Sequence, residues 1–166
     1  MSIHSDHPFA TPEGDRDPLR RLRGRMAAPV TVWTTGTGKE RHGLTISSVV
    51  VAEGEPAHVL GLVDEDADFW TARPETVVVN LLGSPHRYVA DVFAGSAPAP
   101  GGMFTQGEWD DSPWGPVLRD SVGWIGLRLA PDPREVGWRL LVDGVVEHAE
   151  VGEADPLIHL RGRYRD

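Results

Sequence analysis

The chain has 166 residues, enough for one domain with a substantial core but too few for a second domain of similar size. Its formal net charge of −9 argues against non-specific nucleic-acid binding, because neutralising phosphates requires a basic surface. The absence of cysteine excludes disulfides, thiolate nucleophiles and cysteine-ligated metal centres.

The first 16 residues are polar and contain two prolines, so we expect a flexible tail at 1–16 ahead of a single domain at 17–166. This tail lacks the apolar segment of a signal peptide. No apolar run approaches the roughly 20 residues that a membrane-spanning helix requires. The sequence therefore predicts a cytoplasmic protein with no membrane or nucleic-acid partner.

Residues 17–26 carry a helix start signal, with Asp17 as the N-cap and Pro18 at the first helical position. Apolar side chains recur on one side of this helix, which predicts that it caps a sheet; they are Leu19, Leu22 and Met26. The basic side chains are interpreted as its solvated side, with an RNA or phosphate contact as the alternative; they are Arg20, Arg21, Arg23 and Arg25.

Beyond this helix the apolar pattern changes to a period of two, which is typical of β-strands. We expect strands at 29–35, 41–51, 57–63, 76–82, 121–129 and 136–151, the last as one long strand or a bent pair, and helices at 64–73 and 86–94. The first two strands should form a hairpin around 36–39, and Asp143 with Gly144 should form a bulge or turn. Repeated hairpins with few crossovers favour an antiparallel barrel decorated by helices.

Polar or small residues interrupt three of these strands. Thr45, Ser47 and Ser48 are either ordinary solvent-facing residues or donors for a phosphate or the edge of a planar heterocycle. Gly61 indicates the close approach of a backbone or a flat ligand. Asn80, inside an apolar run, must bond to a neighbouring strand end or to a ligand.

Four carboxylates follow the strand at 57–63, at Asp64, Glu65, Asp66 and Asp68. Their spacing does not match a calcium-binding loop, and acidic residues are favoured at a helix N-terminus in any case. We therefore expect no metal site here.

The segment 95–116 shows no clear period and is rich in proline and glycine. Its large apolar residues are Met103, Phe104, Trp109 and Trp114. Structureless stretches of this length in a compact domain are usually functional, and exposed aromatic residues at this density would be unfavourable in a free monomer. The segment therefore predicts a dimer contact or a ligand lid.

Several separated motifs together resemble the flavin reductase-like, FMN-binding split-barrel family. In chain order they are VTVWTT at 30–35, GLTISS at 43–48, VVVNLL at 77–82, VADVFA at 89–94, WGPVL at 114–118 and RGRY at 161–164. The resemblance covers about residues 18 to 165. It implies a mainly β fold with a few helices, a Greek-key antiparallel split barrel that forms a homodimer.

The same resemblance implies a flavin-binding oxidoreductase that uses NAD(P)H to reduce FMN or FAD and that can serve a partner monooxygenase. Hydride passes from nicotinamide to flavin, so the protein chiefly holds the two rings face to face and needs no catalytic triad. Two alternatives stay open. One is a flavoprotein that retains FMN for another redox or sensing role, and the other is a cofactor-less barrel that acts as an interaction module.

The resemblance also assigns candidate site residues. The flavin-contacting segment corresponds to Thr45, Ile46, Ser47 and Ser48. The ring would lie along Leu60, Gly61 and Leu62, and the polar position that ends the central strand is Asn80. Approaching from the C-terminal strand, near the nicotinamide, would be Arg163, Tyr164 and the candidate catalytic residue His159.

The sequence departs from the family pattern in two places. The carboxylates at 64–68 stand where the family often has a Ser/Thr pair that holds the flavin phosphate, and carboxylates repel a phosphate. Arg73 and Arg87 are the nearest basic residues that can compensate. His159 stands one place earlier than in the common family pattern, so a core or interface histidine is the alternative.

Overall fold

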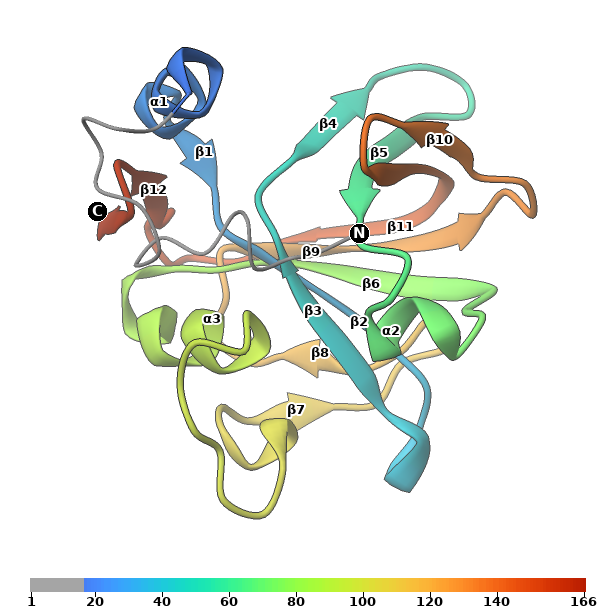
Figure 1. Ribbon diagram of the computed structural model, residues 1–166. Coiled ribbons are helices and arrows are strands. Elements are labelled where there is room, and N and C mark those ends of the chain that lie inside the picture. The colour runs from blue at the N-terminus through green and yellow to red at the C-terminus, as the bar shows by residue number, and fades with distance from the viewer. Residues whose placement is uncertain (1–16) are drawn as a thin grey trace.

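One curled antiparallel sheet organises the chain, which is described over residues 17–166 by a computed structural model (Figure 1). The predicted flexible tail at 1–16 lies outside the described residues. The strands of the sheet are β2 (Thr31–Thr35), β3 (His42–Ile46), β4 (Val49–Ala52), β5 (His58–Val63), β6 (Thr76–Leu81), β9 (Gly123–Leu129), β10 (Arg134–Val136) and β11 (Arg139–Val151). Their order is β3-β2-β6-β9-β11-β5-β4, with β10 paired to β11.

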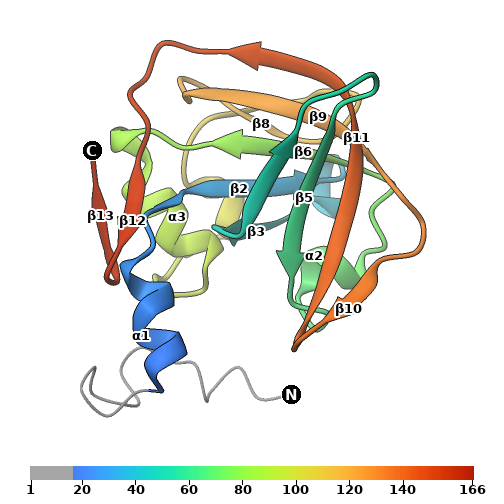
Figure 2. The same cartoon turned by 90° about the horizontal axis from the view of Figure 1, so that it is seen from above.

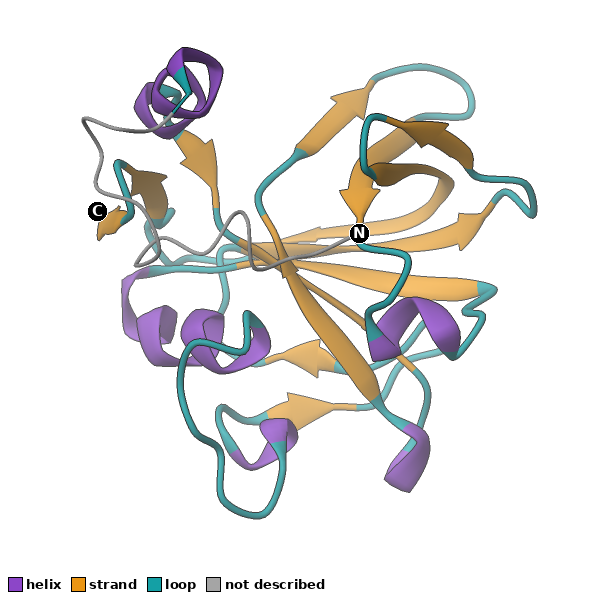
Figure 3. Cartoon of the chain, viewed as in Figure 1, coloured by secondary structure: helices purple, strands orange, loops and turns teal. Residues whose placement is uncertain are grey.

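The remaining elements are short and lie around this sheet (Figure 3). The helices are α1 (Pro18–Arg25), α2 (Asp68–Thr71) and α3 (Arg87–Phe93), with 3-10 turns at Gly38–Glu40, Ser84–His86 and Met103–Thr105. A second sheet has the order β1 (Ala28–Pro29), β12 (Ile158–Leu160) and β13 (Arg163–Arg165), and β7 (Trp109–Asp110) pairs with β8 (Val117–Leu118). The fold is therefore mainly β with few helices, as predicted.

The sheet curls so far that its two edges come together, and Figure 2 shows β3, β4 and β5 at this closure. β3 and β4 are consecutive in the chain yet lie at opposite ends of the strand order. The two-residue link between them, Ser47 and Ser48, spans the closure, where the Leu62 amide donates to the Ser48 carbonyl at 3.2 Å. The single strand predicted over 41–51 is therefore wrong, because Val49 onward pairs with β5 rather than with β2.

Two apolar cores lie on the two faces of the sheet. The inner core fills the curl around Trp33, Val77, Val79, Leu127 and Val142. The outer core lies between the sheet and α3, around Val32, Leu82, Val89, Phe93 and Leu118. Because β2 and β6 are covered on both faces, the prediction of a central strand at 76–82 is confirmed.

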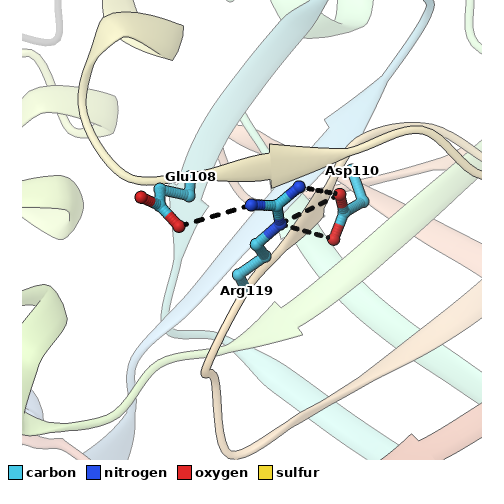
Figure 4. A network of polar contacts seen from close by, with 3 residues as sticks. All are labelled: Glu108, Asp110 and Arg119. Carbon is cyan, nitrogen blue, oxygen red and sulfur yellow. Dashed lines mark hydrogen bonds and ion pairs between the residues drawn. The ribbon is translucent and has the colours of Figure 1, made fainter.

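Phe104 and Trp109 of the segment 95–116 are partly buried and pack against the outer core rather than standing exposed. Trp114 is also partly buried, but it lies against Trp124 and His148. The dimer contact or ligand lid stays a prediction. The rings of Phe104 and Trp109 lie 5.0 and 5.4 Å from that of Phe93, centroid to centroid. The hairpin β7–β8 holds this segment in place. On its surface Arg119 bonds Asp110 through Nη2 at 2.7 Å and approaches Glu108 at 3.5 Å (Figure 4).

The start of α1 is confirmed, since the Asp17 carboxylate accepts a hydrogen bond from the Leu19 amide at 3.1 Å. The prediction that α1 caps a sheet is wrong. Its apolar side faces outward, with exposed fractions of 71% for Leu19, 59% for Leu22 and 70% for Met26. This helix therefore buries none of its side chains within the described chain.

The long strand predicted over 136–151 is confirmed for 139–151, which form β11, while Val136 ends β10. β10 and β11 form a hairpin whose turn lies at 137–138. Asp143 and Gly144 are regularly paired with β5, so the predicted bulge at this point is wrong. The irregularity lies between Val146 and His148, opposite β9. Among residues 17–166, no helix is long and apolar enough to cross a membrane.

Candidate functional site

The three hydroxyl side chains near the sheet closure divide between two surroundings. Thr45 points under α3, where its Oγ1 donates to the Ala90 carbonyl at 2.7 Å. Ser47 and Ser48 are exposed on the link between β3 and β4. Ile46 is buried in the inner core, so it can contribute to a surface site only through its backbone. The link therefore offers two free-standing hydroxyls to a ligand rather than three.

Next to this link, β5 presents a half-buried apolar surface. Leu60 and Leu62 alternate with the buried Val59, Gly61 and Val63, so the two leucines share the outer face of the strand. Gly61 faces the interior, where an added Cβ would lie 2.7 Å from Cζ2 of Trp33. The flat group that approaches Gly61 is therefore an indole ring of the same chain, and only the two leucines offer side chains to a ligand.

Asn80 is fully buried on β6, and both ends of its amide bond to protein groups. Nδ2 donates to the Val32 carbonyl at 3.0 Å and to Thr34 Oγ1 at 3.1 Å. Oδ1 accepts from the Leu118 amide at 2.8 Å. The amide thus connects β2 to β8. This is the alternative in which Asn80 bonds to a neighbouring strand end. We therefore leave Asn80 out of the proposed ligand contacts.

A second group of predicted residues gathers around α3. The hydroxyl of Tyr164 on β13 donates to Oδ1 of Asp91 at 2.7 Å, and the His159 ring stands edge-on to the Tyr164 ring at 5.6 Å. Arg87, at the start of α3, pairs with Asp166 at 2.7 Å. Thr45, Arg87, His159 and Tyr164 are therefore all connected to α3 or to residues that contact it.

Burial sets the protonation states in this group. It lowers the pKa of His159, an effect opposed by the nearby Asp91 carboxylate, so the imidazole is mainly neutral at neutral pH. It also raises the pKa of the Tyr164 hydroxyl, together with the hydrogen bond to Asp91. His159 can therefore donate or accept a hydrogen bond but is a poor proton reservoir at neutral pH. The positive charge is supplied by Arg87 and the exposed Arg163.

Sequence reasoning did not single out Asp91 as a site residue. It lies in the segment 89–94 that carries part of the family resemblance, and that was the available signal. Among the described residues, no three histidine or acidic side chains lie close enough together to hold a metal ion. A cavity of about 570 Å³ is lined by none of the predicted site residues, and it lies beside Arg73 instead.

The geometry combines exposed serine hydroxyls, an adjacent apolar strand face and a neutral aromatic pair near arginines. Residues 23–166 match the family described as Flavin reductase like domain. This chain belongs to the flavin reductase-like domain family. The family resemblance predicted from the motifs is thereby confirmed, and the match covers nearly the whole described chain.

Named relatives of this flavin reductase-like chain agree with the assignment. It is 31% identical over 157 residues to FMN reductase (NADH) RutF of Ancylobacter novellus, covering 92% of this chain and 86% of that protein. It is 29% identical over 154 residues to FMN reductase (NADH) RutF of Methylorubrum extorquens, covering 91% and 75%.

Solved structures show the same fold. The flavin reductase PheA2 in its native state is 25% identical with a TM-score of 0.80, covering 90% of this chain and 97% of that one. The NADH:FAD oxidoreductase SgcE6 of Streptomyces globisporus C-1027, in complex with NAD and FAD fragments, is 25% identical with a TM-score of 0.81, and 94% of each chain is covered.

Proposed function

We propose that this chain is an NADH-dependent flavin reductase that reduces FMN or FAD. The observation that carries the proposal is the family match over residues 23–166, together with relatives that are named as NADH-linked FMN reductases. NADH and the bound flavin supply the redox chemistry themselves. The residues of the chain then have to bind, orient and shield the two rings.

The donor set near the sheet closure fits a flavin. Ser47 and Ser48 present exposed hydroxyls and backbone amides that suit a polar ring edge or a phosphate. Leu60 and Leu62 present an apolar face on the adjacent strand that suits a tricyclic ring. Because Ile46, Gly61 and Asn80 point into the protein, the proposed site uses at most their backbones.

The group around α3 would contribute charge and shape on the nicotinamide side. Arg87 and Arg163 are the exposed cations beside α3 and on β13, and they can attract phosphates of either cofactor. His159 and Tyr164 would line the site as neutral aromatic residues. His159 as a catalytic residue stays a prediction, and its neutral state favours positioning of the nicotinamide over proton transfer.

We also propose that the chain works as a homodimer. The exposed side of α1 and the edge strand β4 carry large apolar residues, namely Leu19, Leu22, Met26, Val50 and Val51. An eight-residue helix is too short to be stable in water alone, and an exposed apolar edge strand invites pairing. A second copy of the chain that covers these residues would stabilise the helix and protect the edge strand.

Transfer of reduced flavin to a partner monooxygenase, and the cytoplasmic location, stay predictions from the family resemblance and the sequence. A pull-down of an oxygenase and a cell fractionation test them separately. Light scattering of the purified protein tests the dimer, and Leu22→Asp is expected to shift the mass towards the monomer. A monomeric wild-type protein would contradict the dimer.

The reductase proposal is tested by titrating the purified protein with FMN and FAD and by following NADH and NADPH oxidation. We expect flavin-dependent NADH oxidation well above the rate without protein. Tight flavin binding without turnover would favour the alternative of a redox or sensing flavoprotein. Failure to bind either flavin would favour a cofactor-less interaction module.

A further inference from the structure

The cavity of about 570 Å³ lies where the segment after α2 meets the ends of β6 and β9. The Leu129 amide donates to the Glu75 carbonyl at 2.9 Å, and Thr76 is paired with Arg128, so these segments form one continuous wall. Figure 1 shows α2 and this end of β6 on the same side of the molecule. A cavity of this volume is in the usual range for a small-molecule site.

This cavity lies away from the sheet closure that carries the proposed flavin contacts. The closure adjoins the end of β6 at Leu81, because Leu81 pairs with Thr31 and Thr31 pairs with Ile46. The cavity adjoins the other end of β6, at Thr76. Thr76 and Leu81 are about 17 Å apart along an extended strand.

Arg73 is held in the cavity wall in an unusual backbone conformation. It lies two residues after the end of α2 with a φ of 53°, the left-handed conformation in which glycine is the residue without steric cost. The position nevertheless carries a long cationic side chain. Among residues 17–166 the Arg73 guanidinium forms no ion pair, so its charge is available to a ligand.

Arg128 also lines the cavity, but its guanidinium is engaged elsewhere. Its Nε donates to Glu147 Oε2 at 3.2 Å, and its side chain is 57% exposed. Leu129 and Trp70 pack against the inner core, so the alternating side chain of Arg128 lies on the opposite face of the sheet and is left out of the proposed contacts.

The rest of the lining is largely apolar, apart from one carboxylate. Trp70 lines the cavity together with Leu129 and Pro131. Glu75 also lines the cavity, and its charge opposes an anion. An arginine and a tryptophan in one cavity suit a planar ring that carries an acidic group.

We propose that this cavity binds a planar aromatic carboxylate, with the carboxylate held by Arg73 and the ring packed on Trp70. The site is independent of the flavin contacts, and the proposal does not rest on the reductase activity. The presence of the arginine side chain at a position that favours glycine is explained by this ligand.

The test is calorimetric titration of the whole protein with 2-naphthoate, in the absence and presence of saturating FMN. We expect saturable binding with a Kd of about 1 mM or tighter, as for a small ligand on a half-open site. The neutral isostere 2-naphthamide should bind more weakly, since it lacks the charge. Inorganic sulfate should also bind more weakly, because it cannot contact Trp70.

Arg73→Gly is the decisive variant, because glycine suits the left-handed conformation and the fold should keep or gain thermal stability. We expect its affinity for 2-naphthoate to fall by about fivefold or more. Arg161→Gly is the matched control, since Arg161 is also exposed with a φ of 52° but lies in the β12–β13 turn. The control should bind as the wild type does. Glu75→Gln should tighten binding.

Four results would each overturn the proposal. They are the absence of saturable binding, equal weakening by Arg73→Gly and Arg161→Gly, weakening rather than tightening by Glu75→Gln, and displacement of 2-naphthoate by FMN. The last result would assign the cavity to the flavin site. Loss of NADH oxidation with retained naphthoate binding would contradict only the reductase proposal, so the two failures are distinguishable.

Discussion

The Tyr164 hydroxyl donates to Oδ1 of Asp91 at 2.7 Å, and this bond fastens the C-terminal hairpin to α3. The two residues are 73 positions apart in the chain. The bond positions the ring against which His159 stands, so we expect it to order the side of the proposed site that would hold the nicotinamide. Loss of this bond should therefore weaken the binding of NADH more than the binding of flavin.

Tyr164→Phe removes the bond and keeps the ring. We expect the free energy of unfolding to fall by about 1 kcal/mol, the net value of one hydrogen bond, and KM for NADH to rise more than that for FMN. Denaturant titration and steady-state kinetics check this. Tyr88→Phe is the matched control, since Tyr88 donates to the Pro98 carbonyl at 2.6 Å from an exposed position. Equal effects of both variants on NADH would show that Tyr164 has no role at the site.

Local patterns predicted the strands well where one face or both faces are buried. The periodic runs at 29–35, 57–63, 76–82 and 121–129 all contain strands. The run at 41–51 failed because its apolar residues serve two different partners, with Ile46 in the inner core and Val50 exposed at the edge beside β5. The curl of the sheet decides such pairings, and the local period does not report it.

The sequence showed which residues have a special role more reliably than it showed where their side chains point. Gly61 does permit a close approach, but of Trp33, and Asn80 is bonded, but to β2 and β8. Thr45 donates to α3 rather than to solvent. Each of these partners lies far along the chain, so only the three-dimensional packing could identify it. Of the three predicted hydroxyl donors, the exposed Ser47 and Ser48 are the two that stay available to a ligand.

Gly61→Ala tests the packing of the inner core. An added Cβ would lie 2.7 Å from the Trp33 ring, and the indole is fully buried, so it cannot move without disturbing its neighbours. We expect a loss of about 1–3 kcal/mol in the free energy of unfolding, the usual cost of overpacking. Denaturant titration measures it. Gly24→Ala is the control, because nothing lies within 4 Å of that position on α1, and there alanine should be neutral or stabilising. A neutral Gly61→Ala would contradict the packing argument.

The stability of the protein should fall in mild acid. Burial lowers the pKa of both His86 and His159 in the folded state, and Asp120 and Asp91 respectively oppose this. Protonation then favours the unfolded chain, whose histidines have the ordinary pKa of about 6.5. Above that pH, these two histidines should not change the free energy of unfolding. Below it, the free energy of unfolding should decrease until the pH has passed the pKa values of the folded state. The double variant His86→Gln, His159→Gln should show a shallower slope in denaturant titrations between about pH 6.5 and pH 5. An unchanged slope would show that other groups cause the acid sensitivity.

Ser48→Asp tests the flavin contacts at the sheet closure. Ser48 is exposed and its carbonyl bonds to the Leu62 amide, so the substitution should leave the fold and its thermal stability unchanged. A carboxylate at this position would repel the flavin phosphate or the electron-rich edge of the ring, and we expect FMN affinity to fall by about tenfold or more. Fluorescence titration with FMN measures the change, and Ser96→Asp, an exposed serine after α3, controls for the added charge alone. Wild-type FMN affinity in the Ser48 variant would show that this residue is not part of the site. An equal loss of FMN affinity in the Ser96 variant would show that the effect comes only from the net charge of the chain.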